Sequence, residues 1–288
     1  MIEYSLPGLY SCYNLNKAFM LTIEEYREVL RSEVQIASVY GCFPPAIWNG
    51  GRKVNGFCSM EQISEELEFW NSRNIGCMFT FSNSEIKENH IYDSFCNKLL
   101  SIAYNELNGV IVNSDILRTY IQRVFPDYKI ISSTTKCLKS IEEFESECKK
   151  KIDVVVLDYS LNHSDRLSLI SHPEKAELLV NAYCRDNCPE RLLHYKVLSK
   201  SQLEFEDKSS FHECKYVLDD FYTIRDSRKS FITVNEVENY YLQGINKFKI
   251  EGRTNSIFDV LESYIYYLVK PEWADRIRLY TLKKADAL

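Results

Sequence analysis

The stretch Asp153-Val154-Val155-Val156-Leu157-Asp158 decides the fold class of this 288-residue chain. Its four apolar residues follow one another without the alternation of apolar and polar residues that marks a strand with one wet face. Such a run is typical of a strand buried on both faces, as in a parallel sheet. Parallel strands need crossover connections, which are usually helices, so the flanking sequence should alternate between strand and helix.

The flanking sequence has this alternation. Short runs rich in β-branched residues predict strands at residues 34–40, 77–81, 109–113, 129–133, 153–158, 177–181, 230–233 and 247–251. Apolar residues at helical spacing lie between them, for example Ile63, Leu67 and Trp70. Eight such units predict one α/β domain over residues 1–288, a (β/α)8 TIM-type barrel with residues 1–32 as an amino-terminal extension. A doubly wound open sheet is the alternative, but the chain contains no Gly-x-Gly-x-x-Gly motif.

The composition limits the classes of function. The formal net charge of −6 argues against bulk nucleic-acid binding and against docking on an anionic membrane. No stretch approaches the roughly 20 consecutive apolar residues of a membrane span, and the first residues lack the features of a signal peptide. We therefore expect a cytoplasmic protein in which most of the ten cysteines are buried thiols and not disulfides.

Polar residues follow several of the predicted strands, at the end where the loops of a barrel build its active site. Asp158 and Glu251 are the carboxylates best placed there for acid–base catalysis. Arg253 precedes a predicted helix and would bind an anion together with the amides of its first turn. Each of the three has a structural alternative as an ion-pair partner. The expected substrate contacts at this mouth are Arg52, Asn113 and Asn181.

A long segment with weak periodicity, residues 196–229, separates the sixth predicted strand from the seventh. Loops of this length are usually functional or mobile. Cys184 and Cys188 precede it at a spacing that lets two thiolates face one metal, and Cys214 within it could complete the site. A zinc site, a nucleophilic Cys184 and unmetallated thiols are the alternatives. The histidines that could join a zinc site or activate a thiol are His194 and His212.

Two segments carry a family resemblance. One is Asn181-x-x-Cys184-x-x-x-Cys188-Pro189-x-Arg191-x-x-His194, and the other is residues 244–253, which end in Phe-Lys-Ile-Glu-Gly-Arg. They resemble the collagenase-like peptidase family of uncertain catalytic type, and a looser similarity covers residues 33–270. The resemblance implies a barrel fold. It also implies a four-cysteine iron–sulfur cluster, which several members use in oxygen-independent hydroxylation of RNA bases or of a quinone precursor; other members are labelled peptidases.

The resemblance assigns roles to individual residues of this chain. The implied ligands of a [4Fe–4S] cluster are Cys184, Cys188, Cys214 and, as the fourth, Cys42, with Cys58 in reserve. The same motif adds Arg191 and His194 to the expected substrate contacts. The spacing of Cys214 differs from the family pattern. Zinc is the alternative metal, because it binds mixed thiolate and imidazole ligands and needs no fourth cysteine.

Three functional hypotheses follow. The first is a cluster-dependent modification, such as an oxygen-independent hydroxylation, of a small-molecule or peptide substrate at the barrel mouth. The second is a peptidase-like hydrolase, although the sequence has no convincing catalytic triad or metalloprotease motif. The third is a metal-binding scaffold that needs a partner protein. RNA is not the expected substrate, because the chain is short for this family and acidic.

Overall fold

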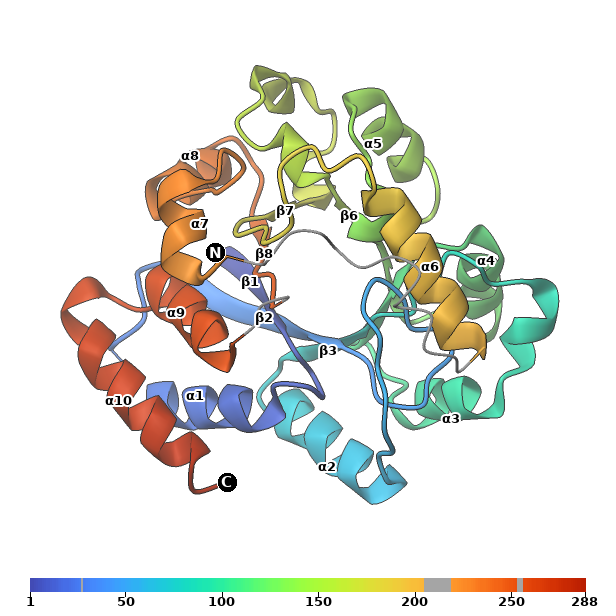
Figure 1. Ribbon diagram of the computed structural model, residues 1–288, viewed down its shortest axis with the longest axis horizontal. Coiled ribbons are helices and arrows are strands. Elements are labelled where there is room, and N and C mark those ends of the chain that lie inside the picture. Colours follow the sequence, from blue (N-terminus) through green and yellow to red (C-terminus); the bar gives the residue numbers. More distant parts are fainter. Residues whose placement is uncertain (27, 205–218, 253–255) are drawn as a thin grey trace.

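The computed structural model describes residues 1–26, 28–204, 219–252 and 256–288. It is a closed barrel of parallel strands that pair in chain order, which confirms the predicted fold class (Figure 1). The strands are β1 (Ile2–Pro7), β2 (Val34–Gly41), β3 (Gly76–Phe79), β4 (Gly109–Val112), β5 (Lys129–Ser132), β6 (Val154–Val156), β7 (Ala176–Leu179) and β8 (Lys247–Lys249). β1 pairs with both β2 and β8, and these pairings close the barrel.

Helices surround the barrel (Figure 1). They are α1 (Tyr13–Glu25), α2 (Met60–Asn71), α3 (Ser94–Ile102), α4 (Asp115–Val124), α5 (Ile141–Cys148), α6 (Arg191–Glu204), α7 (Phe221–Ser227), α8 (Val234–Leu242), α9 (Ile257–Leu268) and α10 (Ala274–Ala285). The connection from β6 to β7 is built from three short 3-10 segments instead of an α-helix. No helix in the described part of the chain is both long and apolar enough to cross a bilayer.

The interior of the barrel is divided into an apolar and a polar half. The apolar half is formed by one side chain from each of β3 to β6: Met78, Ile111, Ile131 and Val156. The polar half comes from the strands on the other side of the barrel: Ser5, Ser38, Glu177 and Lys249. This second set is unusual, because branched apolar residues dominate most barrel interiors.

Two of the predicted segments are assigned wrongly, one as an extension and one as a strand. Residues 1–32 are not an extension, since they contain β1 and α1. Residues 230–233 are not a strand: Ile232 N–H donates one hydrogen bond to the Val180 carbonyl (2.9 Å), and Thr233 caps α8. An extended segment that enters a helix and a strand that enters a barrel have similar local patterns, so only the pairing distinguishes them.

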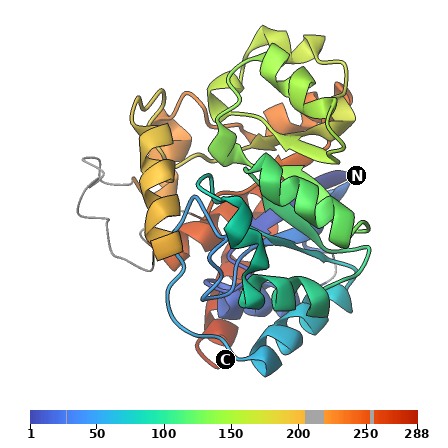
Figure 2. The ribbon, with the colours of Figure 1, turned by 90° about the vertical axis from the view of Figure 1, so that its right-hand side faces the viewer.

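The predicted long segment after the sixth strand has several parts. Residues 196–204 belong to α6, residues 205–218 lie outside the described part of the chain, and α7 follows. α6 stands apart from the other helices, on the face of the barrel that Figure 1 views, and Figure 2 shows it at the edge of the molecule. This helix therefore covers part of one barrel end.

Candidate active site at the barrel mouth

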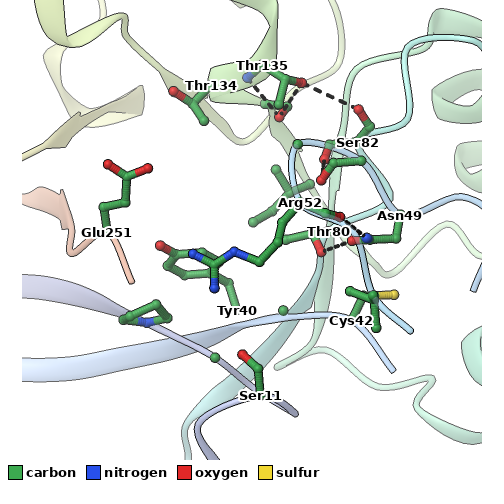
Figure 3. Close-up of a pocket in the computed structure, with 18 of the residues that line it drawn as sticks. Ser11, Tyr40, Cys42, Asn49, Arg52, Thr80, Ser82, Thr134, Thr135 and Glu251 are labelled. Atoms are coloured by element: carbon green, nitrogen blue, oxygen red, sulfur yellow. Dashed lines mark hydrogen bonds between the residues drawn. The ribbon is translucent and has the colours of Figure 1, made fainter. Parts of the chain in front are cut away.

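A cavity of about 260 Å³ opens at the carboxyl ends of the strands. Its walls include residues that follow β1, β2, β3, β5 and β6, together with residues of β8 and α6. Figure 3 shows hydroxyl, amide and aromatic side chains from these different segments around one space. The described lining residues that carry chemistry are Tyr10, Ser11, Tyr40, Cys42, Asn49, Arg52, Lys53, Asn55, Thr80, Ser82, Ser133, Thr134, Thr135, Tyr159, Tyr195, Lys249 and Glu251.

The loop after β2 brings Arg52 to this cavity. Asn49 holds the loop in two directions: its amide nitrogen donates to the Arg52 carbonyl (2.5 Å), and its side-chain oxygen accepts a hydrogen bond from Thr80 Oγ1 (2.7 Å). Gly50 lies so close to the next loop that a Cβ there would stand 2.4 Å from the Ser82 carbonyl oxygen. Only glycine permits this approach of the two loops.

Asn83 connects the same loop to α6. Its buried side-chain amide donates to the carbonyl oxygens of Ile47 (3.0 Å), Asn49 (3.3 Å) and Ser199 (2.9 Å), the last of which belongs to α6. A buried amide with several acceptors fixes the backbone segments that supply them. Two walls of the cavity are thus held in place by one side chain.

Glu251 lines the cavity, two residues after the end of β8. One of its carboxylate oxygens accepts a hydrogen bond from the Tyr183 N–H (2.8 Å). Asn181, predicted as a substrate contact, instead joins two strand ends: its side chain accepts from the Glu251 N–H (2.6 Å) and donates to Ser263 (3.0 Å). Asn181 therefore positions Glu251 and does not line the cavity.

Asp158 and Arg191 form a buried ion pair with each other. The Arg191 guanidinium also lies over the Tyr159 ring, 4.2 Å from its centroid. Neither residue is among those that line the cavity. Asp158 was predicted as a catalytic carboxylate and Arg191 as a substrate contact. In the structure, their ion pair attaches the start of α6 to the end of β6.

The remaining predicted contacts are dispersed. Asn113 lies in a second groove and donates to Thr135 Oγ1 (2.9 Å). His194 is a half-buried residue of α6 whose ring stacks near Tyr195. Arg253, predicted as a catalytic anion contact, lies outside the described residues.

The cysteines fall into two groups by exposure. Cys184 and Cys188, on the connection between β7 and α6, are partly exposed, whereas the other described cysteines are buried. Burial raises the pKa of the Cys42 thiol, which disfavours the thiolate that a metal requires. Figure 3 shows the Cys42 sulfur directed away from Glu251. Cys58 is also buried, and burial raises the pKa of its thiol to about 11.

The described residues do not form a metal site by themselves. Among them, no three histidine, cysteine, aspartate or glutamate side chains are grouped so that they could hold an ion. Cys42, Cys184 and Cys188 are therefore not brought together, and neither are Cys184, Cys188 and His194. Cys214 and His212 lie outside the described part of the chain.

Sequence reasoning missed the tyrosines of the cavity and, above all, Lys249. Lys249 is buried in β8, with its Nζ 3.4 Å from Glu177 Oε2 and 3.8 Å from the centroid of the Tyr40 ring. The signal was present in Lys247-Phe248-Lys249-Ile250, where a charged residue alternates with apolar ones inside a barrel strand. A charged residue at such a position faces either the barrel interior or solvent. Because β8 is not an edge strand, the interior is the direction to expect for Lys249.

Fold and cavity together define the chain as a (β/α)8 barrel with a cavity of ligand size at the carboxyl ends of its strands. Neither a family model nor a curated protein matches the chain. A solved structure, that of the U32 peptidase Mk0906, is similar with a TM-score of 0.53 and 13% identity, over 76% of this chain and 87% of that one. The predicted resemblance is thereby confirmed at the level of the fold.

Proposed function

We propose that this chain is a barrel enzyme that acts on a small anionic substrate bound in the cavity at its mouth. The observation that carries the proposal is the charge of the walls. The described lining residues include two cations from the loop after β2, Arg52 and Lys53, against one carboxylate, Glu251; a third basic residue of the lining, Lys249, is paired with Glu177. Hydroxyl groups and tyrosines supply the remaining polar contacts, and Glu251 is the group placed for acid–base work.

The size of the cavity supports a small substrate. Pockets for drug-sized ligands have volumes of roughly 300–1,000 Å³. At about 260 Å³ this cavity lies just below that range, so it suits a small molecule better than a peptide. The substrate chemistry that fits it best is a short carboxylate or phosphate with further oxygen atoms.

Arg52→Gln should weaken the binding of small anions by tenfold or more, because a hydrogen bond to a charged group contributes about 1.5–3 kcal/mol. Calorimetric titration with pyruvate, citrate and inorganic phosphate, with glycerol as the neutral probe, measures this. Arg123→Gln is the matched control, because it removes the same charge from an exposed position on α4. Equal anion affinities in the two variants, or binding of glycerol alone, would contradict the proposal.

A second candidate is the cluster-dependent modification, such as an oxygen-independent hydroxylation, that the family resemblance implies. It is favoured by the partial exposure of Cys184 and Cys188, in contrast to the buried thiols elsewhere in the described chain. These two thiols alone do not complete a site, so we derive no reaction step through a cluster. The peptidase-like alternative has less support, because no histidine is among the described residues that line the cavity.

Iron, sulfide and zinc analysis of protein purified without oxygen tests the second candidate. If this candidate holds, the analysis finds about four iron and four sulfide per chain, as for a four-cysteine [4Fe–4S] cluster, and both are lost in Cys184→Ala. Cys148→Ala, which removes a buried thiol from α5, should retain both. One zinc per chain would indicate a structural or hydrolytic site instead, and the absence of both metals would reject a resident metal.

A further inference from the structure

Lys249 lies in the wall of the cavity and inside the barrel. It is the last residue of β8, in register with Ser5 of β1 and Leu179 of β7. The neighbouring Phe248 belongs to the core between strands and helices, so Lys249 faces the opposite way, into the barrel. A lysine is seldom buried unless it is paired or has a chemical role.

Polar groups from three neighbouring strands surround the Lys249 amine. Glu177 of β7 is its charged partner at 3.4 Å, and the Tyr40 ring of β2 lies 3.8 Å from it. Glu177 also accepts a hydrogen bond from Ser5 of β1 (2.7 Å), which in turn accepts one from Ser38 (3.0 Å). The carboxylate is therefore fixed beside the amine by a chain of hydrogen bonds.

A structural role alone does not explain this pair well. Removing two charges from water costs several kcal/mol per ion, and a buried ion pair often stabilises a fold no more than apolar side chains of the same size. Here apolar residues already fill the other half of the interior at the same level. Lys249 nevertheless lines the cavity, and this placement of a buried amine points to chemistry.

The environment makes the amine more reactive than a surface lysine. Desolvation lowers the pKa of Lys249, and the nearby Glu177 carboxylate opposes this without reversing it. A larger fraction of the amine is then unprotonated at neutral pH, and only the unprotonated amine has the lone pair that attacks a carbonyl carbon.

We propose that Lys249 forms a Schiff base with the carbonyl carbon of a small 2-oxo acid, whose carboxylate is held by Arg52. This inference rests on the proposed function and names its substrate class. Both residues line the same cavity, and a short 2-oxo acid offers one anionic group for the arginine and one electrophilic carbon for the amine.

The step balances without an oxidant or a further reactant. Glu177 accepts a proton from the Lys249 ammonium, and the amine lone pair then forms a C–N bond while the carbonyl π electrons move to oxygen. The nitrogen passes a proton to that oxygen, which gives a neutral carbinolamine. Glu177 returns its proton to the hydroxyl group, the C–O bond breaks, and water leaves. One ammonium and one carbonyl become one protonated imine and one water.

Reductive trapping tests the inference. The unaltered chain is incubated with pyruvate and sodium cyanoborohydride, and the adduct is located by intact mass and peptide mapping. We expect one reduced pyruvyl group per chain, on Lys249. Lys249→Arg keeps a positive charge beside Glu177 and should form no adduct, whereas Lys247→Arg, on the same strand with its amine bonded to the Glu174 carbonyl, should form it fully.

Lactate separates this inference from the proposed function, because it has the same carboxylate without a carbonyl group. Binding of both pyruvate and lactate with no adduct on Lys249 would overturn the Schiff base and leave the anion site standing. Adducts on other lysines alone would also overturn it. If neither compound nor any other anion binds, the proposed function itself fails. Mapping on the unaltered chain makes the result independent of how well Lys249→Arg folds.

Discussion

Arg191→Met is expected to lower the free energy of unfolding by about 3–5 kcal/mol, the usual cost of breaking a buried ion pair from one side. Arg191 is 5% exposed and its partner Asp158 is 1% exposed, so the substitution leaves a carboxylate in the interior without its counter-charge. The substitution also removes the contact between the Arg191 guanidinium and the Tyr159 ring. Denaturation with urea, monitored by circular dichroism, measures the loss.

A matched surface pair provides the control. Arg166 and Glu142 form an ion pair with side chains that are 53% and 72% exposed. Arg166→Met should cost less than about 1 kcal/mol, because solvent screens such pairs. The double variant Asp158→Asn with Arg191→Met should recover part of the loss, since it no longer buries a charge. Similar small effects in both single variants would mean that Arg191 does not anchor α6.

The Asp158–Arg191 pair shows what a sequence leaves open about a site. Asp158 follows the clearest strand of the chain, but the structure buries it beside Arg191 and not in the wall of the cavity. Its partner lies 33 positions later and belongs to the first turn of α6. The sequence around either residue does not show that the two will be in contact. A carboxylate available for catalysis and a carboxylate neutralised by an arginine therefore have the same local sequence pattern.

Arg52 and Glu251 were predictable for the opposite reason. Glu251 closely follows β8, and Arg52 lies in the glycine-containing loop after β2. Residues at such positions lie at the barrel mouth in any barrel of this kind, independently of the other contacts of the fold. Lys249 was missed because its direction depends on the register of β8 against β1 and β7. A shift of one residue would turn it outward, and the sequence alone does not fix that register.

The same limitation affected the first strand. β1 has the sequence Ile-Glu-Tyr-Ser-Leu-Pro, which alternates apolar and polar residues and lacks the continuous apolar run of β6. Its polar Ser5 faces a barrel interior that is itself polar on this side. A pattern that normally indicates one wet face here reflects the Glu177–Lys249 environment, which becomes visible only when the barrel closes.

Tyr4→Ala is expected to lower the free energy of unfolding by about 3–5 kcal/mol, as for other large aromatic side chains removed from a core. Tyr4 is 1% exposed and lies on the outer side of β1. Its ring centroid is 5.8 Å from those of Phe248 in β8 and Tyr267 in α9. The substitution therefore opens a void where β1 joins the last strand and the helix that covers it.

Tyr92→Ala is the matched control, because it deletes the same side chain at a position that is 76% exposed. It should change the free energy of unfolding by less than about 0.5 kcal/mol. Hydrogen exchange adds a local measurement: in Tyr4→Ala the amides of β2 and β8 should exchange faster, because both strands pair with β1. Equal stabilities of the two variants would mean that the first residues do not hold the barrel closed, and would restore their interpretation as an extension.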